Sequence, residues 1–256
     1  MVPELGPVRL KLVEAQSLGF LGPAPVDDQL EHSSAFVTVI RRLVAPIGAS
    51  TERLSESRRS PVTAIARPDG GDHELLRIAD LGSGGGLPGL VVASLMPGAR
   101  VYLIEGSMRR ADWLAKVTAE LELRNVEVVG ARAELAGRSA ELRGTMQVVT
   151  SRSFGPTAVV AECAAPLLLP GGVLVVSEPP ESEHLRWSSR QDVAIPSERR
   201  THLDGRWPPP ALGLLGLSGA EPVQEGGRSF AVLTLRAPCP ERFPRRTGVP
   251  EKRPLF

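Results

Sequence analysis

The stretch IADLGSGGGLPGL, residues 78–90, decides the fold of this chain. An apolar run typical of a β-strand ends at Asp80 and Leu81, and a loop with five glycines and a proline follows. A glycine-rich turn between a strand and a helix lets a ligand lie close to the backbone and directs the helix N-terminus toward it. The stretch therefore predicts an α/β fold with a nucleotide-type cofactor at the end of its first strand.

The spacing of the glycines leaves two cofactor classes open. Gly84, Gly86 and Gly89 satisfy the G-x-G-x-x-G pattern of dinucleotide-binding folds. Asp80, Gly82, Gly84 and Gly86 also form a D-x-G-x-G-x-G pattern, which sets a carboxylate in front of the loop. That carboxylate would repel a pyrophosphate and attract the ammonium and sulfonium groups of S-adenosylmethionine. The charge of Asp80 therefore favours S-adenosylmethionine over a dinucleotide.

Two further acids follow the next predicted strands. Glu105 closes the strand VYLIE, where a carboxylate can accept hydrogen bonds from both hydroxyls of a ribose. Dinucleotide sites use an acid at this place as well, so Glu105 indicates a ribose without identifying the cofactor. Glu134, in ARAEL after the third strand, lies where an adenine edge would be read, and it is equally typical of an ordinary acid at a helix start.

Between residues 77 and 180, short β-type runs alternate with helical patterns, as in the βαβ units of a parallel sheet. The predicted strands are RIADLG, RVYLIE, NVEVVG, MQVVTS and GGVLVVSE. Near the end of the chain, RSFAVLTLRA reads as an antiparallel strand at the sheet edge. The prediction is thus a mostly parallel sheet with an antiparallel edge strand and helices on both faces.

The rest of the chain has a different character. Residues 27–46 form an amphipathic helical pattern, whereas residues 179–228 are rich in proline, tryptophan and charge and read as irregular structure covering the sheet. We therefore divide the chain into four parts. They are an N-terminal helical segment (1–46), a linker or insertion (47–76), a cofactor-binding domain (77–240) and a basic, proline-rich C-terminal segment (241–256).

The overall composition is that of a globular chain, with 42% hydrophobic and 23% charged residues. The net charge of +1 does not indicate a nucleic-acid partner, so such a partner would need a local basic patch. Cys163 and Cys239 have no neighbouring Cys or His at metal-ligand spacing, so we expect neither a zinc site nor a disulfide. No apolar run has the length of a membrane span, and we expect a cytoplasmic protein without membrane contact.

Several motifs together resemble the RsmG family, also called glucose-inhibited division protein B. They are DLGSGGGLPGL, RAEL, TSRSFGP, LLLPGG and CPERFPRRTGVPEKRPLF, and the resemblance covers about residues 77–178 and 228–256. The family consists of class I S-adenosylmethionine-dependent methyltransferases that act on N7 of a guanine in 16S ribosomal RNA. The resemblance therefore implies a Rossmann-like class I methyltransferase fold, that cofactor, 16S ribosomal RNA or the small ribosomal subunit as partner, and a monomer.

The resemblance also implies site residues. The loop supplies Gly82 and Leu87, RAE supplies Ala133 and Glu134, and TSRSF supplies Arg152, which would face the methyl-transfer pocket. For Arg152, a salt-bridged arginine at a strand end is the alternative. The predicted cofactor-binding set is therefore Asp80, Gly82, Gly84, Gly86, Leu87, Glu105, Ala133, Glu134 and Arg152.

The reaction that the resemblance implies needs no catalytic acid or base. Guanine N7 is a lone-pair nucleophile with no proton to lose, so the site has to supply proximity and alignment, which can contribute roughly 7–11 kcal/mol of the barrier. We therefore predict no general acid or base and no metal ligand, with Arg152 as a positioning residue.

The C-terminal segment is the candidate RNA-binding part. It carries five basic residues among prolines, a stiff and cationic arrangement suited to phosphates: Arg242, Arg245, Arg246, Lys252 and Arg253. The alternatives are that this segment is simply solvated, or that Phe243 and Phe256 pin it to the domain.

The N-terminal part departs from the family pattern, because only His32 remains of a His-x-x-Asp-Ser motif. We expect His32 to be a surface or packing residue. Two other functions stay open. A small-molecule methyltransferase would share the cofactor residues, and a non-catalytic ribosome-assembly or RNA-binding protein that keeps the fold would be expected to lose Asp80 or Glu105, both of which are present.

Overall fold

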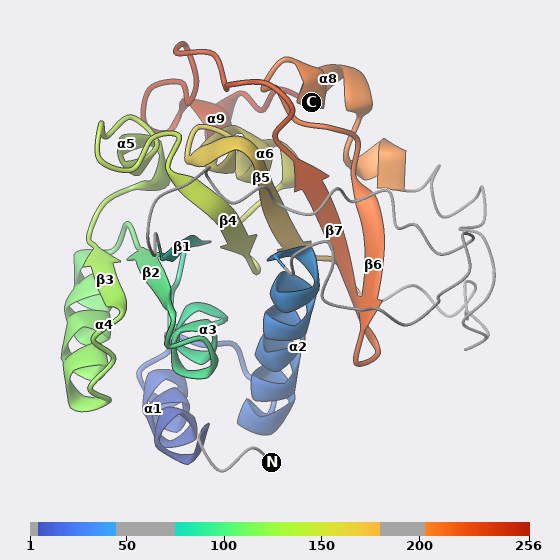
Figure 1. The fold of residues 1–256 in the computed structure, drawn as a ribbon. Coiled ribbons are helices and arrows are strands. Elements are labelled where there is room, and N and C mark those ends of the chain that lie inside the picture. The colour runs from blue at the N-terminus through green and yellow to red at the C-terminus, as the bar shows by residue number, and fades with distance from the viewer. Residues whose placement is uncertain (1–4, 45–74, 180–202) are drawn as a thin grey trace.

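A seven-stranded sheet forms the centre of the computed structural model, which describes residues 5–44, 75–179 and 203–256 (Figure 1). The strand order is β3-β2-β1-β4-β5-β7-β6. The strands are β1 (Leu76–Leu81), β2 (Ala99–Ile104), β3 (Val126–Val129), β4 (Met146–Ser151), β5 (Leu168–Ser177), β6 (Glu221–Glu225) and β7 (Arg228–Thr234). Strands β1 to β5 pair in parallel, while β7 runs antiparallel to β5 and β6 antiparallel to β7. The predicted mostly parallel α/β sheet with an antiparallel edge is confirmed.

The middle of the sheet is buried on both faces. Every residue of β4 is buried, and β1 is buried from Ile78 to its end. Continuous apolar runs of this kind are typical of parallel strands covered on both sides. The strand order reverses between β1 and β4, and in open α/β sheets ligands bind beyond the carboxyl ends of the strands at such a point. The fold therefore predicts a ligand site at the loops that follow Leu81 and Ser151.

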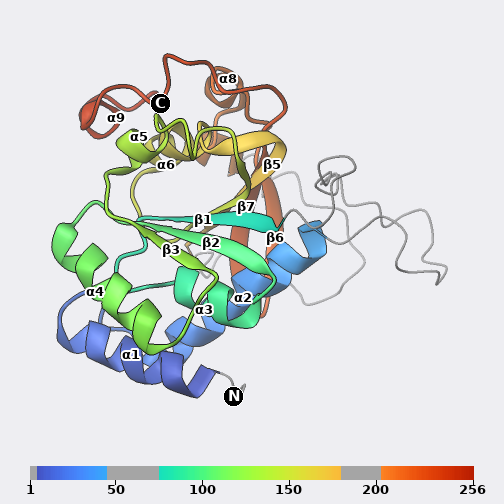
Figure 2. The same cartoon turned by 60° about the vertical axis from the view of Figure 1, so that its left-hand side comes forward.

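Helices cover both faces of the sheet, as Figures 1 and 2 show. One face carries α1 (Gly6–Ser17), α2 (Val26–Val44), α3 (Gly89–Leu95) and α4 (Met108–Glu120). The other carries α5 (Ala133–Ala136), α6 (Thr157–Ala164), α8 (Pro209–Gly213) and α9 (Val249–Lys252). Helices α1 to α4 contribute to one hydrophobic cluster against the sheet, and α5, α6 and α8 contribute to a second one.

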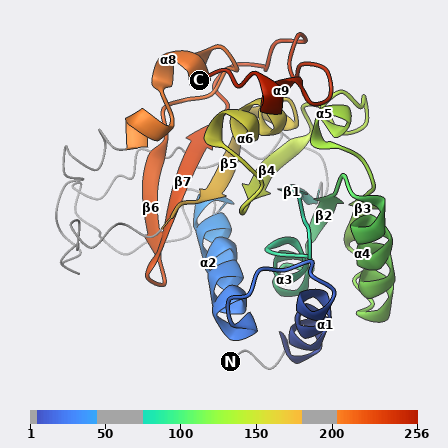
Figure 3. The same cartoon turned by 180° about the vertical axis from the view of Figure 1, so that it is seen from behind.

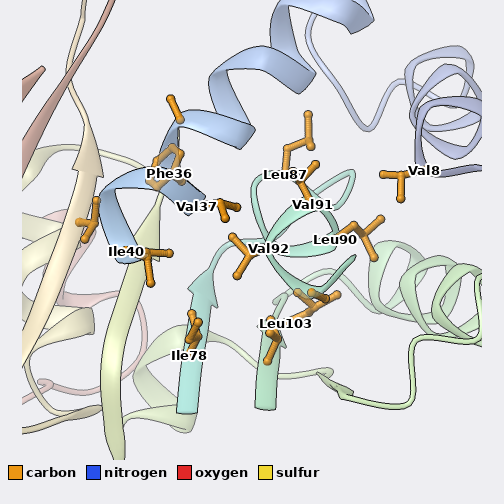
Figure 4. Packing of buried hydrophobic residues seen from close by; sticks show 14 of the residues in the cluster. Val8, Phe36, Val37, Ile40, Ile78, Leu87, Leu90, Val91, Val92 and Leu103 are labelled. Atoms are coloured by element: carbon orange, nitrogen blue, oxygen red, sulfur yellow. The ribbon is translucent and has the colours of Figure 1, made fainter. Parts of the chain in front are cut away.

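The amphipathic pattern after residue 26 gives α2, the longest described helix. Acidic residues Asp27 and Asp28 lie in its first turn and Arg41 and Arg42 in its last, which complements the helix dipole at both ends. Its apolar stripe packs against α3 and the strands below, where Phe36, Val37 and Ile40 lie beside Val92 and Ile78 (Figure 4).

Helix α1 lies within the predicted N-terminal helical segment (1–46), although the sequence analysis gives bounds only for the helical pattern over residues 27–46. Its buried residues Val8, Leu12 and Ala15 recur at helical spacing, which places one face of α1 in the same core as α2 and α3. The N-terminal helices and the sheet therefore share one hydrophobic cluster. The linker predicted for residues 47–76 lies outside the described residues, except for Leu75 and Leu76.

The prediction for the last strands needs a correction. The strand predicted at the sheet edge is β7, but it lies between β5 and β6. The edge is formed by β6, which falls within residues 179–228, where irregular structure was expected. Gly226 and Gly227 join β6 to β7 with φ values of 54° and 70°, the backbone that a two-residue hairpin turn requires. The helix that follows the third strand, α5, is short and ends at Ala136.

Among residues 5–44, 75–179 and 203–256, no helix combines the length and the apolar character that a bilayer crossing requires.

Phe36 offers a test of this packing. Its side chain is fully buried, and its ring meets that of Phe230 edge to face at 4.8 Å between centroids, which joins α2 to β7. We expect Phe36→Ala to lower the free energy of unfolding by about 3–5 kcal/mol, because it leaves a cavity in the core. Urea unfolding followed by circular dichroism measures this change. Leu10→Ala, on the exposed side of α1, is the control and should change it by less than about 0.5 kcal/mol. Similar losses in both variants would contradict the assigned packing.

Candidate functional site

A cavity of about 420 Å³ opens at the carboxyl edge of the sheet. Residues that follow β1, β2, β3 and β4 line it, namely Gly82, Glu105, Gly106, Ser107, Arg110, Arg132, Ala133, Glu134, Ser153 and Phe154, together with Ile104 at the end of β2. A larger hollow of about 660 Å³ lies between α1, α2 and the β6–β7 turn, away from the strand ends. We assign the candidate site to the smaller cavity, because it lies where open α/β sheets bind their ligands.

The glycine loop forms one wall of this cavity. Gly82 has a φ of 72°, and a Cβ atom added to it would lie 2.3 Å from Cδ2 of the Phe154 ring. A side chain at this position would therefore strain the backbone and collide with Phe154. Gly84 and Gly86 also have positive φ values, whereas Leu87 does not line the cavity and packs in the core beside α3 (Figure 4).

Asp80 lies behind the loop rather than on the cavity wall. Only 1% of the residue is exposed, and both carboxylate oxygens accept hydrogen bonds. The backbone N–H of Gly89, at the start of α3, donates to Oδ2 at 3.1 Å, and the Thr150 hydroxyl on β4 donates to Oδ1 at 2.9 Å. Burial raises the pKa of Asp80 to about 6, outweighing the opposing effect of these hydrogen bonds. Asp80 therefore fixes the loop between β1, β4 and α3 and does not itself line the cavity.

Glu105 lies on the cavity wall with its carboxylate already positioned. The N–H of Gly84 donates to Oε2 and the N–H of Ser107 to Oε1, both at 2.8 Å. Each oxygen of a carboxylate has a second lone pair, so both can still accept a hydroxyl from a ligand. Ser107 precedes α4 as expected for a capping residue, but its side chain makes no capping hydrogen bond. The arrangement suits the neighbouring hydroxyls of a ribose.

Ala133 and Glu134 begin α5 at the other end of the cavity. The N–H of Gly248 donates to Oε1 of Glu134 at 2.7 Å, and the guanidinium of Arg132 donates to both oxygens at 3.3 Å. Burial by itself would raise the pKa of Glu134, but these hydrogen bonds outweigh it and hold that pKa below its usual value. Glu134 therefore presents a charged carboxylate to the cavity.

Arg152 lies at the end of β4 and points toward α2. Its Nη2 donates to Oε1 of Gln29 at 3.2 Å, and its Nη1 lies 3.5 Å from the Ser33 hydroxyl. Burial lowers the pKa of Arg152, and the charge of Asp80 opposes this effect. Arg152 is therefore separated from the residues that line the 420 Å³ cavity and bridges the strand ends to α2.

Several residues of the site were not predicted from the sequence, although two of them stand in a recognisable pattern. Gln29 and Ser33 are polar residues on the buried stripe of α2, where a polar side chain needs a partner. Arg110 and Arg132 line the cavity beside Glu105 and Glu134, and nothing in their spacing separates them from the many surface arginines.

His32 packs as expected. Its ring stacks on Phe36 and meets Phe230 edge to face, and its Nε2 lies 2.9 Å from the Ser177 hydroxyl. Burial, and to a lesser extent the charges of Arg152 and Arg228, lowers the pKa of His32 to about 4. The imidazole is therefore neutral at pH 7.

The basic residues of the C-terminal segment divide into two kinds. Arg245 forms an ion pair with the fully buried Glu162 of α6. Arg242 stacks over the ring of Phe243 and is exposed, as are Arg246, Lys252 and Arg253. Phe243 itself is buried, so this part of the segment is pinned to the domain.

The raised pKa of Asp80 predicts a pH dependence. Because the folded state binds the proton more tightly than an unfolded chain with the ordinary pKa of 3.8, Asp80 stabilises the fold most below pH 3.8 and loses that contribution as the pH rises through about 6. Between pH 4 and 7 we expect the wild-type protein to lose about 1–3 kcal/mol of unfolding free energy relative to Asp80→Asn. Urea unfolding at a series of pH values measures this difference. A difference that stays constant over the range would contradict the assignment.

Comparison with known proteins places the chain in a family. Residues 67–189 match the GidB family, described as rRNA small subunit methyltransferase G. Proteins named ribosomal RNA small subunit methyltransferase G are 37% identical over 179 residues in Rubrobacter xylanophilus and 35% identical over 186 residues in Roseiflexus castenholzii. Each match covers 70% of this chain, and they cover 65% and 71% of the two relatives. The first of these relatives is therefore matched over slightly less than two thirds of its length.

Two further similarities extend over most of the chain. A Prochlorococcus marinus protein of the same name is 30% identical over 262 aligned positions, and the match covers 92% of each chain. The structure of cofactor-bound Rv0187 from MTB matches with a TM-score of 0.52 at 18% identity, over 90% of this chain and 89% of the other. The fold is that of class I S-adenosylmethionine-dependent methyltransferases, and the chain belongs to the rRNA small subunit methyltransferase G family.

Proposed function

We propose that this protein transfers a methyl group from S-adenosylmethionine to N7 of a guanine in 16S ribosomal RNA. The observation that carries the proposal is the Glu105 carboxylate, which two backbone N–H groups hold against the cavity wall in a chain of this family. A cytoplasmic monomer acting on the small ribosomal subunit or its RNA, without membrane contact, completes the proposal.

The cavity fits the nucleoside part of this cofactor. Its volume lies within the usual range for small-molecule sites, about 300–1,000 Å³. We assign the ribose hydroxyls to Glu105 and the adenine to the end formed by Ala133 and Glu134. Gly82 and the rest of the glycine loop let the ligand approach the backbone, and Asp80 adds a negative charge behind it that favours a cationic cofactor.

Once bound, S-adenosylmethionine supplies a methyl group on a positively charged sulfur. The lone pair of guanine N7 can take that methyl group without losing a proton, so the protein does not need to hold a base there. We assign to Arg152 and its α2 partner Gln29 the positioning of the acceptor base, because they lie at the carboxyl end of β4, on the α2 side of the glycine loop. Alignment of this kind supplies roughly 7–11 kcal/mol in well-oriented reactions.

The exposed basic residues of the C-terminal segment are our candidates for RNA phosphate contacts. They are Arg242, Arg246, Lys252 and Arg253. Arg245 belongs to the original candidate set, but we give it a structural role because its guanidinium binds the buried Glu162.

The proposal is tested by transfer of a labelled methyl group from S-adenosylmethionine to isolated 30S subunits and to naked 16S RNA, with nucleoside analysis of the product. We expect 7-methylguanosine in at least one of the two. A small-molecule methyltransferase would bind the cofactor and label neither RNA. A non-catalytic assembly protein would bind the ribosomal particle and transfer no methyl group to any acceptor.

Glu105 gives a direct test of the cofactor assignment. Glu105→Gln removes the charge that would hold the ribose, so we expect the dissociation constant for S-adenosylmethionine to rise about 10- to 100-fold, the usual worth of a hydrogen bond to a charged group. Isothermal titration calorimetry measures it. The matched control is Glu127→Gln, on the exposed part of β3, which should bind like the wild type. Equal affinity of wild type and Glu105→Gln would exclude this ribose site.

The RNA assignment predicts a change in salt dependence. Replacing Arg242, Arg246 and Arg253 together by alanine should weaken RNA binding and reduce the slope of log K against log salt by about 0.7 for each lost phosphate contact. Filter binding between 50 and 200 mM salt, roughly the range over which such contacts dominate, measures the slope. Arg42→Ala, at the far end of α2, is the control. An unchanged slope in the triple variant would rule out the C-terminal segment as the RNA contact.

A further inference from the structure

The C-terminal segment is held against α5 and α6 by several independent contacts, and Figure 3 shows α9 beside both helices. Phe243 is buried in the hydrophobic cluster on this face of the sheet. Arg143 donates hydrogen bonds to the carbonyls of Cys239, Pro240 and Phe243 at 2.8–3.1 Å. The chain is therefore fixed up to Phe243.

An ion pair holds the next residue. The carboxylate of Glu162, on α6, is fully buried, and Arg245 satisfies it with three hydrogen bonds. The backbone N–H and Nε of Arg245 donate to Oε1 at 2.8 Å, and Nη2 donates to Oε2 at 2.6 Å. A buried carboxylate with such a partner is strongly destabilised when the partner is removed. The position of the backbone at Arg245 is therefore tightly specified.

Three residues later the same segment reaches the cofactor cavity. The N–H of Gly248 donates to Oε1 of Glu134 at 2.7 Å, shorter than either hydrogen bond from Arg132 to that carboxylate. Glu134 is only 5% exposed, yet it lines the cavity. Gly248 has a φ of 77°, a left-handed backbone that turns its N–H toward Glu134 and also begins α9. The orientation of Glu134 thus depends on a residue more than a hundred positions away in the sequence.

We propose that residues 243–248 are a positioning element of the cofactor site, in which the Arg245–Glu162 ion pair fixes Gly248 and Gly248 fixes the Glu134 carboxylate for the adenine amine. This inference rests on the proposed function, because it takes the ligand of the cavity to be S-adenosylmethionine. Oε1 of Glu134 already accepts from Gly248 and from Nη2 of Arg132, whereas Oε2 accepts only from Nε of Arg132. The second lone pair of Oε2 is therefore left for the adenine amine. Residues 243–248 therefore act on adenine through Glu134 and not by touching the ligand.

The test compares S-adenosylhomocysteine with its inosine counterpart, in which an oxygen replaces the adenine amine. The full-length wild type should bind the inosine compound less tightly. Arg245→Ala should raise the dissociation constant for S-adenosylhomocysteine about tenfold, as for the loss of a hydrogen bond to a charged group. It should leave that of the inosine compound nearly unchanged, because that ligand makes no use of the Glu134 position.

Two further variants separate positioning from loss of fold. Arg245→Lys keeps a positive charge beside Glu162 but lacks the guanidinium that can donate two parallel hydrogen bonds. This variant should fold, and its dissociation constant for S-adenosylhomocysteine should rise less than that of Arg245→Ala. In the Glu134→Gln background, Arg245→Ala should raise the dissociation constant for S-adenosylhomocysteine little further, because both changes act on the same hydrogen bond between residue 134 and the adenine amine. Glu241→Gln, at an exposed position just before the 243–248 element, should bind both ligands as the wild type does.

The outcomes distinguish this inference from the proposed function. If the wild type bound neither S-adenosylmethionine nor S-adenosylhomocysteine, the proposed function would fall and the inference with it. If the wild type bound both but the Arg245 variants bound equally well, only the inference would be overturned. An equal loss for the adenine and inosine ligands, or full additivity with Glu134→Gln, would also overturn it.

Discussion

The buried carboxylate of Asp80 is the interaction on which the rest of the site depends. It joins three elements at the point where the sheet reverses its strand order: β1, which carries it, β4 through Thr150, and the start of α3 through Gly89. A buried carboxylate without hydrogen-bond partners would destabilise the fold, so both of its oxygens need donors. Those partners set the distance between the strand ends and the helix, and the glycine loop has to span that distance. The cavity therefore takes its shape from a residue that does not line it.

The central fold could be predicted because several levels of structure agree there. Strands β1 to β5 are short apolar runs separated by helical patterns and glycine turns, and a parallel sheet is the arrangement that buries all of them. The edge was harder to predict. Strand β6 carries Glu221, Pro222 and Glu225, residues that suit an exposed edge and hide the strand pattern. The two glycines after it were the remaining signal of a hairpin.

The candidate site was predictable by position but less so by contact. The acids at the strand ends, Glu105 and Glu134, line the cavity because strand topology alone brings those ends together. Asp80 and Arg152 also follow their strands, yet their side chains point to partners that no local pattern reveals. The partner of Arg245 is likewise hidden from any local pattern, because its charge suggests a surface residue in the sequence. Its true partner, Glu162, is a polar residue within an otherwise apolar helix, and the pairing depends on long-range packing.

The hydrogen bonds from Arg152 to α2 have a consequence for how this fold can diversify. The cavity walls come from residues 82–154, whereas the surface that faces Arg152 comes from Gln29 and Ser33, in a stretch of chain before the first strand. The two halves of the site are thus encoded in separate stretches of the gene. Under the proposed function, substitutions in α2 would reshape the acceptor side while the glycine loop and its acids stay as they are, so a new target would not require rebuilding the cofactor half.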